Sequence, residues 1–137
     1  MKNYIIILFS LLLMQGYAQD GSRIEQAKIG YITNKLNLSS TEAEKFWPLY
    51  NEYKSKIKAI RKEMRMDMKE IQNLDAISDK EAETTLNDII SSEQRTLDLK
   101  KEYFVKFKQI LPIKKVILLV RAEREFNKEV LMQMRRK

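Results

Sequence analysis

Residues 38–50 read LSSTEAEKFWPLY, and the first six of them carry the signal that starts a long helix. The Ser39 hydroxyl can accept a hydrogen bond from the backbone N–H of Glu42, and the Glu42 carboxylate can accept one from the backbone N–H of Ser39. Leu38 stands just ahead of this capping box, where its side chain can pack on Ala43. The pattern therefore predicts a helix that begins directly after Ser39.

Apolar side chains continue this helix to about residue 72. Their spacings of three and four place them on one helical face, made of Ala43, Phe46, Trp47, Tyr50, Tyr53, Ile57, Ile60, Met64, Met68 and Ile71. Pro48 removes one backbone donor inside the helix, but the apolar face keeps its phase across the proline. We expect one helix, about 50 Å long and kinked at Pro48, with a break there as the alternative.

The same start signal returns at residue 78, with Ser78 as the cap and Glu81 as its reciprocal partner. After a connector over residues 73–77, it predicts a second long helix. Pro112 disfavours helical backbone at Leu111, so this helix should end near residue 110 or 111, and Pro112 suits the first turn of a last helix. The expected face of the second long helix contains Ala82, Leu86, Ile89, Ile90, Glu93, Leu97, Phe104, Phe107 and Leu111.

The fold class follows from these helices and from composition. The 137 residues include three glycines, two prolines and no cysteine, and residues common in helices dominate. A shorter helix is expected over residues 23–36. The sequence thus predicts an all-α fold of four helices in one domain, residues 23–137, whose two long middle helices form an elongated, bent hairpin.

The N-terminus resembles a secretory signal peptide. Lys2 gives a positive start, residues 4–14 are apolar apart from Ser10, and Gly16 and Ala18 are small residues at the −3 and −1 positions. A bilayer span needs about 20 apolar residues, so we expect cleavage after Ala18 and no permanent membrane anchor. The expected organisation is a signal peptide over residues 1–18, a flexible tail over residues 19–22, and a periplasmic mature chain.

Charge and composition bound the function. The formal net charge is +7, and an exported basic chain is expected to meet acidic protein segments or anionic envelope surfaces, not nucleic acid. The chain has no histidine, the usual acid–base group at neutral pH, and neither a phosphate-binding loop nor a serine beside a base. Glu93 and Glu123 fall on apolar faces, where ion pairing with Lys or Arg is favoured over catalysis. We therefore expect no enzyme activity and no cofactor.

Two groups of residues are candidates for binding another protein. A basic stripe runs beside the apolar face of the first long helix, and its alternative role is a solvated helix flank. An aromatic cluster lies beside Pro48, and its alternative role is to pack residues 23–36 on the long helix. The stripe consists of Lys54, Lys58, Arg61, Arg65 and Lys69, and the cluster of Phe46, Trp47, Tyr50 and Tyr53.

Residues 64–68 read MRMDM, which is similar to a Cu(I)-binding methionine motif. On a helix, Met64 and Met68 share a face and Met66 points roughly to the opposite side. We therefore expect two core methionines and one exposed methionine, with no metal site.

The motifs Leu38-Ser39-Ser40-Thr41-Glu42 and Leu111-Pro112-Ile113-Lys114-Lys115, with the signal peptide and the four helices, resemble the Spy/CpxP family of periplasmic proteins. The first is similar to its LTxxQ motif, with Ser for Thr and Glu for Gln, and the second is a degraded match to its second LTxxQ motif. Residues 44–53 and 111–126 also resemble a Bacteroidetes branch whose members are often called sensors of ECF-type sigma factors.

The resemblance implies a thin helical cradle that usually forms homodimers. It also implies one of two functions. The first is ATP-independent chaperoning of unfolded or partly folded envelope proteins in the envelope stress response. The alternative is regulation through one membrane sensor or anti-sigma partner.

Overall fold

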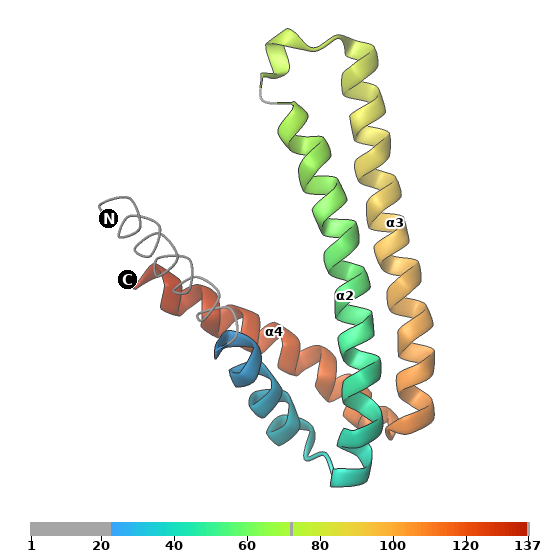
Figure 1. Cartoon of the computed structure of the whole chain (residues 1–137), viewed down its shortest axis with the longest axis vertical. Helices are drawn as coiled ribbons and strands as arrows, with labels where there is room; N and C mark the ends of the chain where they lie inside the picture. Colours follow the sequence, from blue (N-terminus) through green and yellow to red (C-terminus); the bar gives the residue numbers. More distant parts are fainter. Residues whose placement is uncertain (1–22, 72, 137) are drawn as a thin grey trace, which may run out of the picture. The chain divides into compact units, whose positions relative to one another are not determined.

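The structure is a computed structural model that describes residues 23–71 and 73–136, without the side chains of Asp67 and Glu70 (Figure 1). Within these ranges every regular element is helical, so the all-α prediction is confirmed. The elements are a helical segment over residues 23–36, α2 (Ser40–Glu70), the short 3-10 helix η1 (Leu74–Ala76), α3 (Asp79–Ile110) and α4 (Ile113–Arg135). The predicted signal peptide, residues 1–18, and the tail, residues 19–22, lie outside the described residues.

The chain divides into two compact units, and each is described by itself. One spans Ser39–Val116, and the other joins residues 23–38 to residues 117–136. The single domain over residues 23–137 and the cradle shape stay predictions. None of the helices in the described ranges combines the length and the apolar character that a bilayer-spanning segment needs.

The first unit is a helical hairpin, in which α2 and α3 lie side by side and run in opposite directions (Figure 1). Its core is aromatic at the end that holds the start of α2 and the end of α3. Ring centroids of Phe46 and Phe107 lie 5.5 Å apart, and those of Tyr53 and Tyr103 lie 5.3 Å apart. The fully buried side chains of this unit include Phe46, Tyr50, Tyr103 and Phe107.

The helix boundaries agree closely with the sequence-based expectations. α2 continues through Pro48 without a break and ends at Glu70, two residues earlier than predicted. α3 ends at Ile110 as expected. One detail was wrong: the Pro112 carbonyl accepts the backbone N–H of Val116 at 3.2 Å, so Pro112 caps α4 and does not occupy its first turn.

The buried face of α3 agrees with the predicted one at Phe107 and differs from it nearer the start of the helix. Its buried side chains are Ser92, Tyr103 and Phe107, whereas Leu86, Ile90 and Leu97 are about half exposed. A helix turns by about 100° per residue, so the three exposed side chains lie a quarter to a third of a turn away from the line of the three buried ones. The apolar pattern marks two faces of α3, and packing against α2 uses the face that contains Ser92.

In the second unit, the segment 23–36 packs on α4. Ile32, Leu36, Leu119, Ala122 and Phe126 are all buried in it. The segment ends in a left-handed turn at Asn37, which has a φ of 46°, and the Leu38 N–H donates to the Thr33 carbonyl at 3.1 Å. This terminal motif satisfies carbonyls that would otherwise be left without a partner.

Candidate protein-binding surface

The α2–α3 hairpin has two chemically different flanks. Glu63 of α2 and Arg95 of α3 form an ion pair of 2.8 Å. Each lies about a quarter turn from the buried line of its own helix, so the pair marks the flank that both residues share. The opposite flank holds the side chains that lie about a quarter turn to the other side of each buried line. Arg65 on α2 and Leu86 on α3 are two of them.

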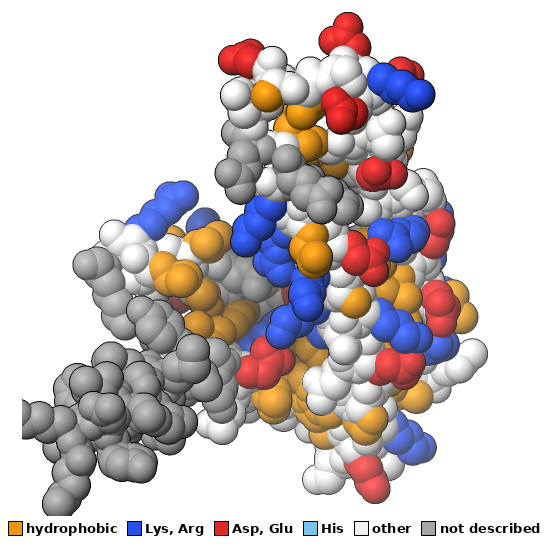
Figure 2. Space-filling view, turned by 45° about the horizontal axis from the view of Figure 1, so that its top comes forward, with side chains coloured by type: hydrophobic (Ala, Val, Ile, Leu, Met, Phe, Trp, Pro, Cys, Tyr) orange, Lys and Arg blue, Asp and Glu red, His pale blue; other side chains and the backbone are white. Residues whose placement is uncertain are grey.

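The marked flank is rich in paired charges. Lys56 pairs with Glu52 at 3.0 Å, and Lys106 pairs with Glu102 at 2.6 Å, which holds the pKa of Glu102 below its usual value. The Lys106 ammonium also lies 4.4 Å from the centre of the Tyr103 ring. Acidic and basic side chains alternate over part of the hairpin in Figure 2, whereas lysines and arginines gather along its other edge.

The opposite flank carries the predicted basic stripe, which we call the basic ribbon: Lys54, Lys58, Arg61, Arg65 and Lys69. Its position beside the buried face is as expected from the helical spacing. Lys54 is half-buried, and its ammonium lies 5.9 Å from the ring centres of both Tyr50 and Tyr53. The other four are exposed, and within the described ranges no hydrogen bond or ion pair involves their side chains.

An exposed apolar line on α3 borders the basic ribbon, and we call it the apolar ribbon. It consists of Leu86, Ile90 and Leu97, with exposed fractions of 56%, 55% and 46%. Exposed aliphatic side chains grouped on one face are typical of an interaction surface, while scattered ones are not. The flank therefore offers an apolar line beside a line of basic side chains, four of which have no ion-pair partner among the described residues. Together the two lines suit an apolar segment that carries acidic residues.

The structure corrects the binding role considered for the aromatic cluster. Phe46 and Tyr50 are fully buried, so neither can anchor a partner, and Trp47 is half-buried against both rings. The expected packing partner was the segment 23–36. Within the hairpin, the ring contacts run to Phe107 of α3, at 5.5 Å from Phe46 and 6.4 Å from Tyr50, and packing on the segment 23–36 stays a prediction.

Both predicted capping boxes are present. The Ser39 N–H donates to the Glu42 carboxylate at 2.8 Å, and the Glu42 N–H donates to the Ser39 hydroxyl at 3.2 Å. Ser78 and Glu81 repeat this arrangement at 2.8 Å and 3.3 Å. Hydrogen bonds from Ser78 to the Glu81 carboxylate keep the pKa of Glu81 below its ordinary value.

Glu42 has a further partner that the sequence did not indicate. The Lys115 ammonium donates to its carboxylate at 2.6 Å, and this bond is the main cause of the lowered pKa of Glu42. The contact joins the segment 38–42 to the segment 111–115, the two motifs on which the family resemblance depends. Leu111 is buried beside them and Pro112 is exposed.

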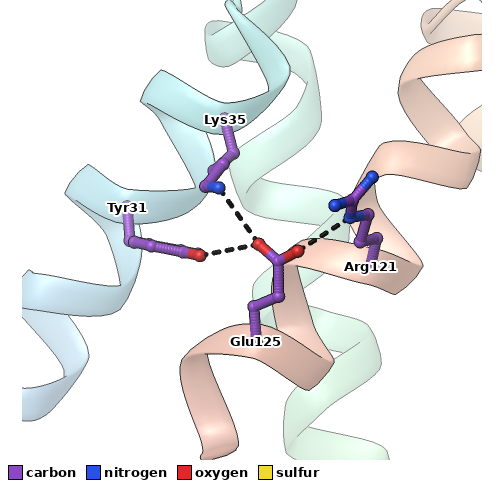
Figure 3. A network of polar contacts seen from close by, with 4 residues as sticks. All are labelled: Tyr31, Lys35, Arg121 and Glu125. Atoms are coloured by element: carbon purple, nitrogen blue, oxygen red, sulfur yellow. Dashed lines mark hydrogen bonds and ion pairs between the residues drawn. The ribbon is translucent and has the colours of Figure 1, made fainter. Parts of the chain in front are cut away.

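A second polar network lies in the other unit and centres on Glu125 of α4 (Figure 3). Its carboxylate accepts from the Tyr31 hydroxyl at 2.9 Å and lies 3.0 Å from the Lys35 ammonium and 2.7 Å from Arg121 Nε. These three donors, Arg121 foremost, lower the pKa of Glu125 to about 2. The network clamps the segment 23–36 to α4, and only the (i, i+4) spacing of Arg121 and Glu125 could have indicated part of it.

The methionine motif gives a mixed outcome. Met66 is 56% exposed as predicted, but Met68 is 51% exposed, so the prediction that it belongs to the core was wrong. Met68 lies beyond the part of α2 that is buried in the hairpin, because Ile57 is the last buried α2 side chain among the described residues. Glu93 is exposed on α3, and Glu123 is half-buried on α4. Among the described residues, no group of three or more Asp, Glu, His or Cys could hold a metal ion.

The chain was compared with known protein families, curated proteins and solved structures. No protein-family profile, no curated protein and no solved structure matches the chain.

Proposed function

We propose that this chain is a non-enzymatic, periplasmic protein-binding protein that acts as an ATP-independent chaperone of the Spy/CpxP kind in the envelope stress response. The main support for the proposal is the hairpin flank on which four exposed cations, without an ion-pair partner among the described residues, border an exposed apolar line. Its clients are unfolded or partly folded envelope proteins.

The two ribbons act at different distances. Charges on the basic ribbon attract acidic segments over roughly 8–10 Å at physiological salt, which speeds encounter without demanding a fixed fit. The apolar ribbon then covers aliphatic and aromatic side chains that an unfolded client exposes to water. Because the flank is an open surface and not a closed pocket, it suits many sequences with shared chemistry.

An aggregation assay tests the proposal. Reduced, unfolded α-lactalbumin, an acidic client, is followed by light scattering with and without the protein, in the absence of ATP. We expect suppression of aggregation that weakens as salt rises. The double variant Arg61→Glu, Arg65→Glu should need about tenfold more protein for the same suppression, because two attractive contacts become repulsive.

The matched control is Arg124→Glu with Lys128→Glu on α4, which changes the net charge equally and leaves the hairpin unaltered. It should suppress aggregation as the wild type does. Equal loss in both variants, or no loss in either, contradicts the role of the basic ribbon. A wild-type protein that suppresses nothing but recovers a single membrane protein from envelope extracts points to the regulatory alternative, a partner of one sensor or anti-sigma protein.

A further inference from the structure

The outer face of α4 is a second surface with unusual chemistry. The inner face of α4 holds Leu119, Ala122 and Phe126, which are buried. At about 100° per residue, the line directly opposite them runs through Ile117, Lys128 and Arg135. The face within about 60° of that line holds Ile117, Val120, Arg121, Arg124, Lys128, Leu131, Met132 and Arg135.

This outer face contains aliphatic and cationic side chains and no acidic one. Ile117, Leu131 and Met132 are 64%, 58% and 42% exposed. Arg121 pairs with Glu125, which lies just outside the face. Within the described residues, no ion pair or hydrogen bond involves the side chain of Arg124, Lys128 or Arg135.

We propose that the outer face of α4 docks on a bilayer surface that contains anionic phospholipids. Charge complementarity selects the partner, because every charged group on the face is positive and a phospholipid headgroup layer offers phosphates at high density. The proposal concerns a surface separate from the two ribbons of the hairpin and does not depend on the chaperone function.

The distribution of side chains favours lipid over an acidic protein. The apolar groups form two patches, Ile117 with Val120 and Leu131 with Met132, and cations lie between them. Specific protein interfaces usually have a continuous apolar core from which charges are depleted, and this face has none. A bilayer surface accepts both kinds of side chain at once, because aliphatic groups enter the acyl boundary while long cationic side chains reach back to the phosphates.

Vesicle co-sedimentation tests the proposal. The probes are vesicles of phosphatidylcholine alone and vesicles with about one-third phosphatidylglycerol, whose surface is negative. We expect the protein to bind the anionic vesicles and to remain in solution with the neutral ones. Arg124→Glu with Lys128→Glu should weaken binding by at least about 25-fold, since each lost cation costs about fivefold and the new carboxylates are repelled by the anionic surface. Leu131→Ser with Met132→Ser should also weaken it.

The matched control is Arg61→Glu with Arg65→Glu, which has the same net charge as the α4 variant. It should bind anionic vesicles like the wild type, although it needs about tenfold more protein to suppress aggregation. All proteins are compared as the mature chain that begins at Gln19, so the apolar residues 4–14 are absent from every sample. Equal binding to both vesicle types overturns the proposal, as does equal weakening by the two charge reversals. Retention by an acidic protein with no binding to anionic vesicles also overturns it. Circular dichroism confirms that each variant is folded.

Discussion

Glu125 joins the segment 23–36 to α4 through its contacts with Tyr31 and Lys35. Its pKa is about 2 in the folded chain against an ordinary value of 4.5, so the ionised form favours folding. This contribution is complete above pH 4.5 and is lost as the pH falls toward 2. Glu125→Gln should therefore lower the melting temperature at neutral pH, and the difference from the wild type should shrink between pH 4.5 and pH 2. Thermal unfolding followed by circular dichroism measures both.

The control for Glu125 is Glu129→Gln, one turn further along α4, where the carboxylate is exposed and forms no ion pair within the described residues. That substitution should leave the melting temperature nearly unchanged at every pH. A Glu125→Gln effect of the same size at pH 7 and pH 2 contradicts the clamp.

The two serine caps make a second prediction at the scale of single residues. Ser39→Ala and Ser78→Ala each remove the side-chain acceptor for one backbone N–H at a helix start. Each should reduce the free energy of unfolding by about 1 kcal/mol in urea titrations. Ser40→Ala is the control, because Ser40 is the first residue of α2 and does not cap it. Equal effects at Ser39 and Ser40 count against the cap.

At the scale of the element, α3 has two apolar faces that should contribute differently to the free energy of unfolding. Phe107 is fully buried and contacts Phe46, Tyr50 and Tyr53, whereas Leu97 is 46% exposed. Phe107→Ala should lower the free energy of unfolding by about 3–5 kcal/mol, because it opens a cavity in the aromatic core. Leu97→Ala should change it by less than about 0.5 kcal/mol. Similar losses in urea unfolding would show that both faces are packed.

The two faces also explain why the predicted face of α3 was right at Phe107 and wrong at Leu86, Ile90 and Leu97. Ser92 and Tyr103 mark the buried line, while Leu86 and Ile90, which are more apolar than a serine, remain half exposed. Apolar periodicity ranks faces by hydrophobicity alone. Where a helix serves both a core and a binding surface, that ranking does not identify the core.

At the scale of the whole molecule, export and self-association are the expectations to test. We expect chain recovered from the periplasm to begin at Gln19, which mass spectrometry of the intact protein determines. Recovery of unprocessed chain from the membrane fraction contradicts cleavage after Ala18.

Self-association stays a prediction, and the exposed aliphatic side chains grouped on α3 are what supports it. Light scattering on the purified protein should give the mass of a homodimer. The mass of a single chain at micromolar concentration or above contradicts this expectation.

Helix type, helix boundaries and the two capping boxes could all be read from the order of residues, because each depends on neighbours within four positions. Residues 38–42 and 78–81 specify their hydrogen bonds locally, and Pro112 ends α3 by a clash with its own neighbour. The pairing of Glu42 with Lys115, 73 positions away, and of Tyr31 with Glu125, 94 positions away, emerged only from the folded chain. So did the choice of the Ser92 face of α3 for the core. Contacts between distant segments depend on how whole helices pack, and local periodicity carries no information about their partners.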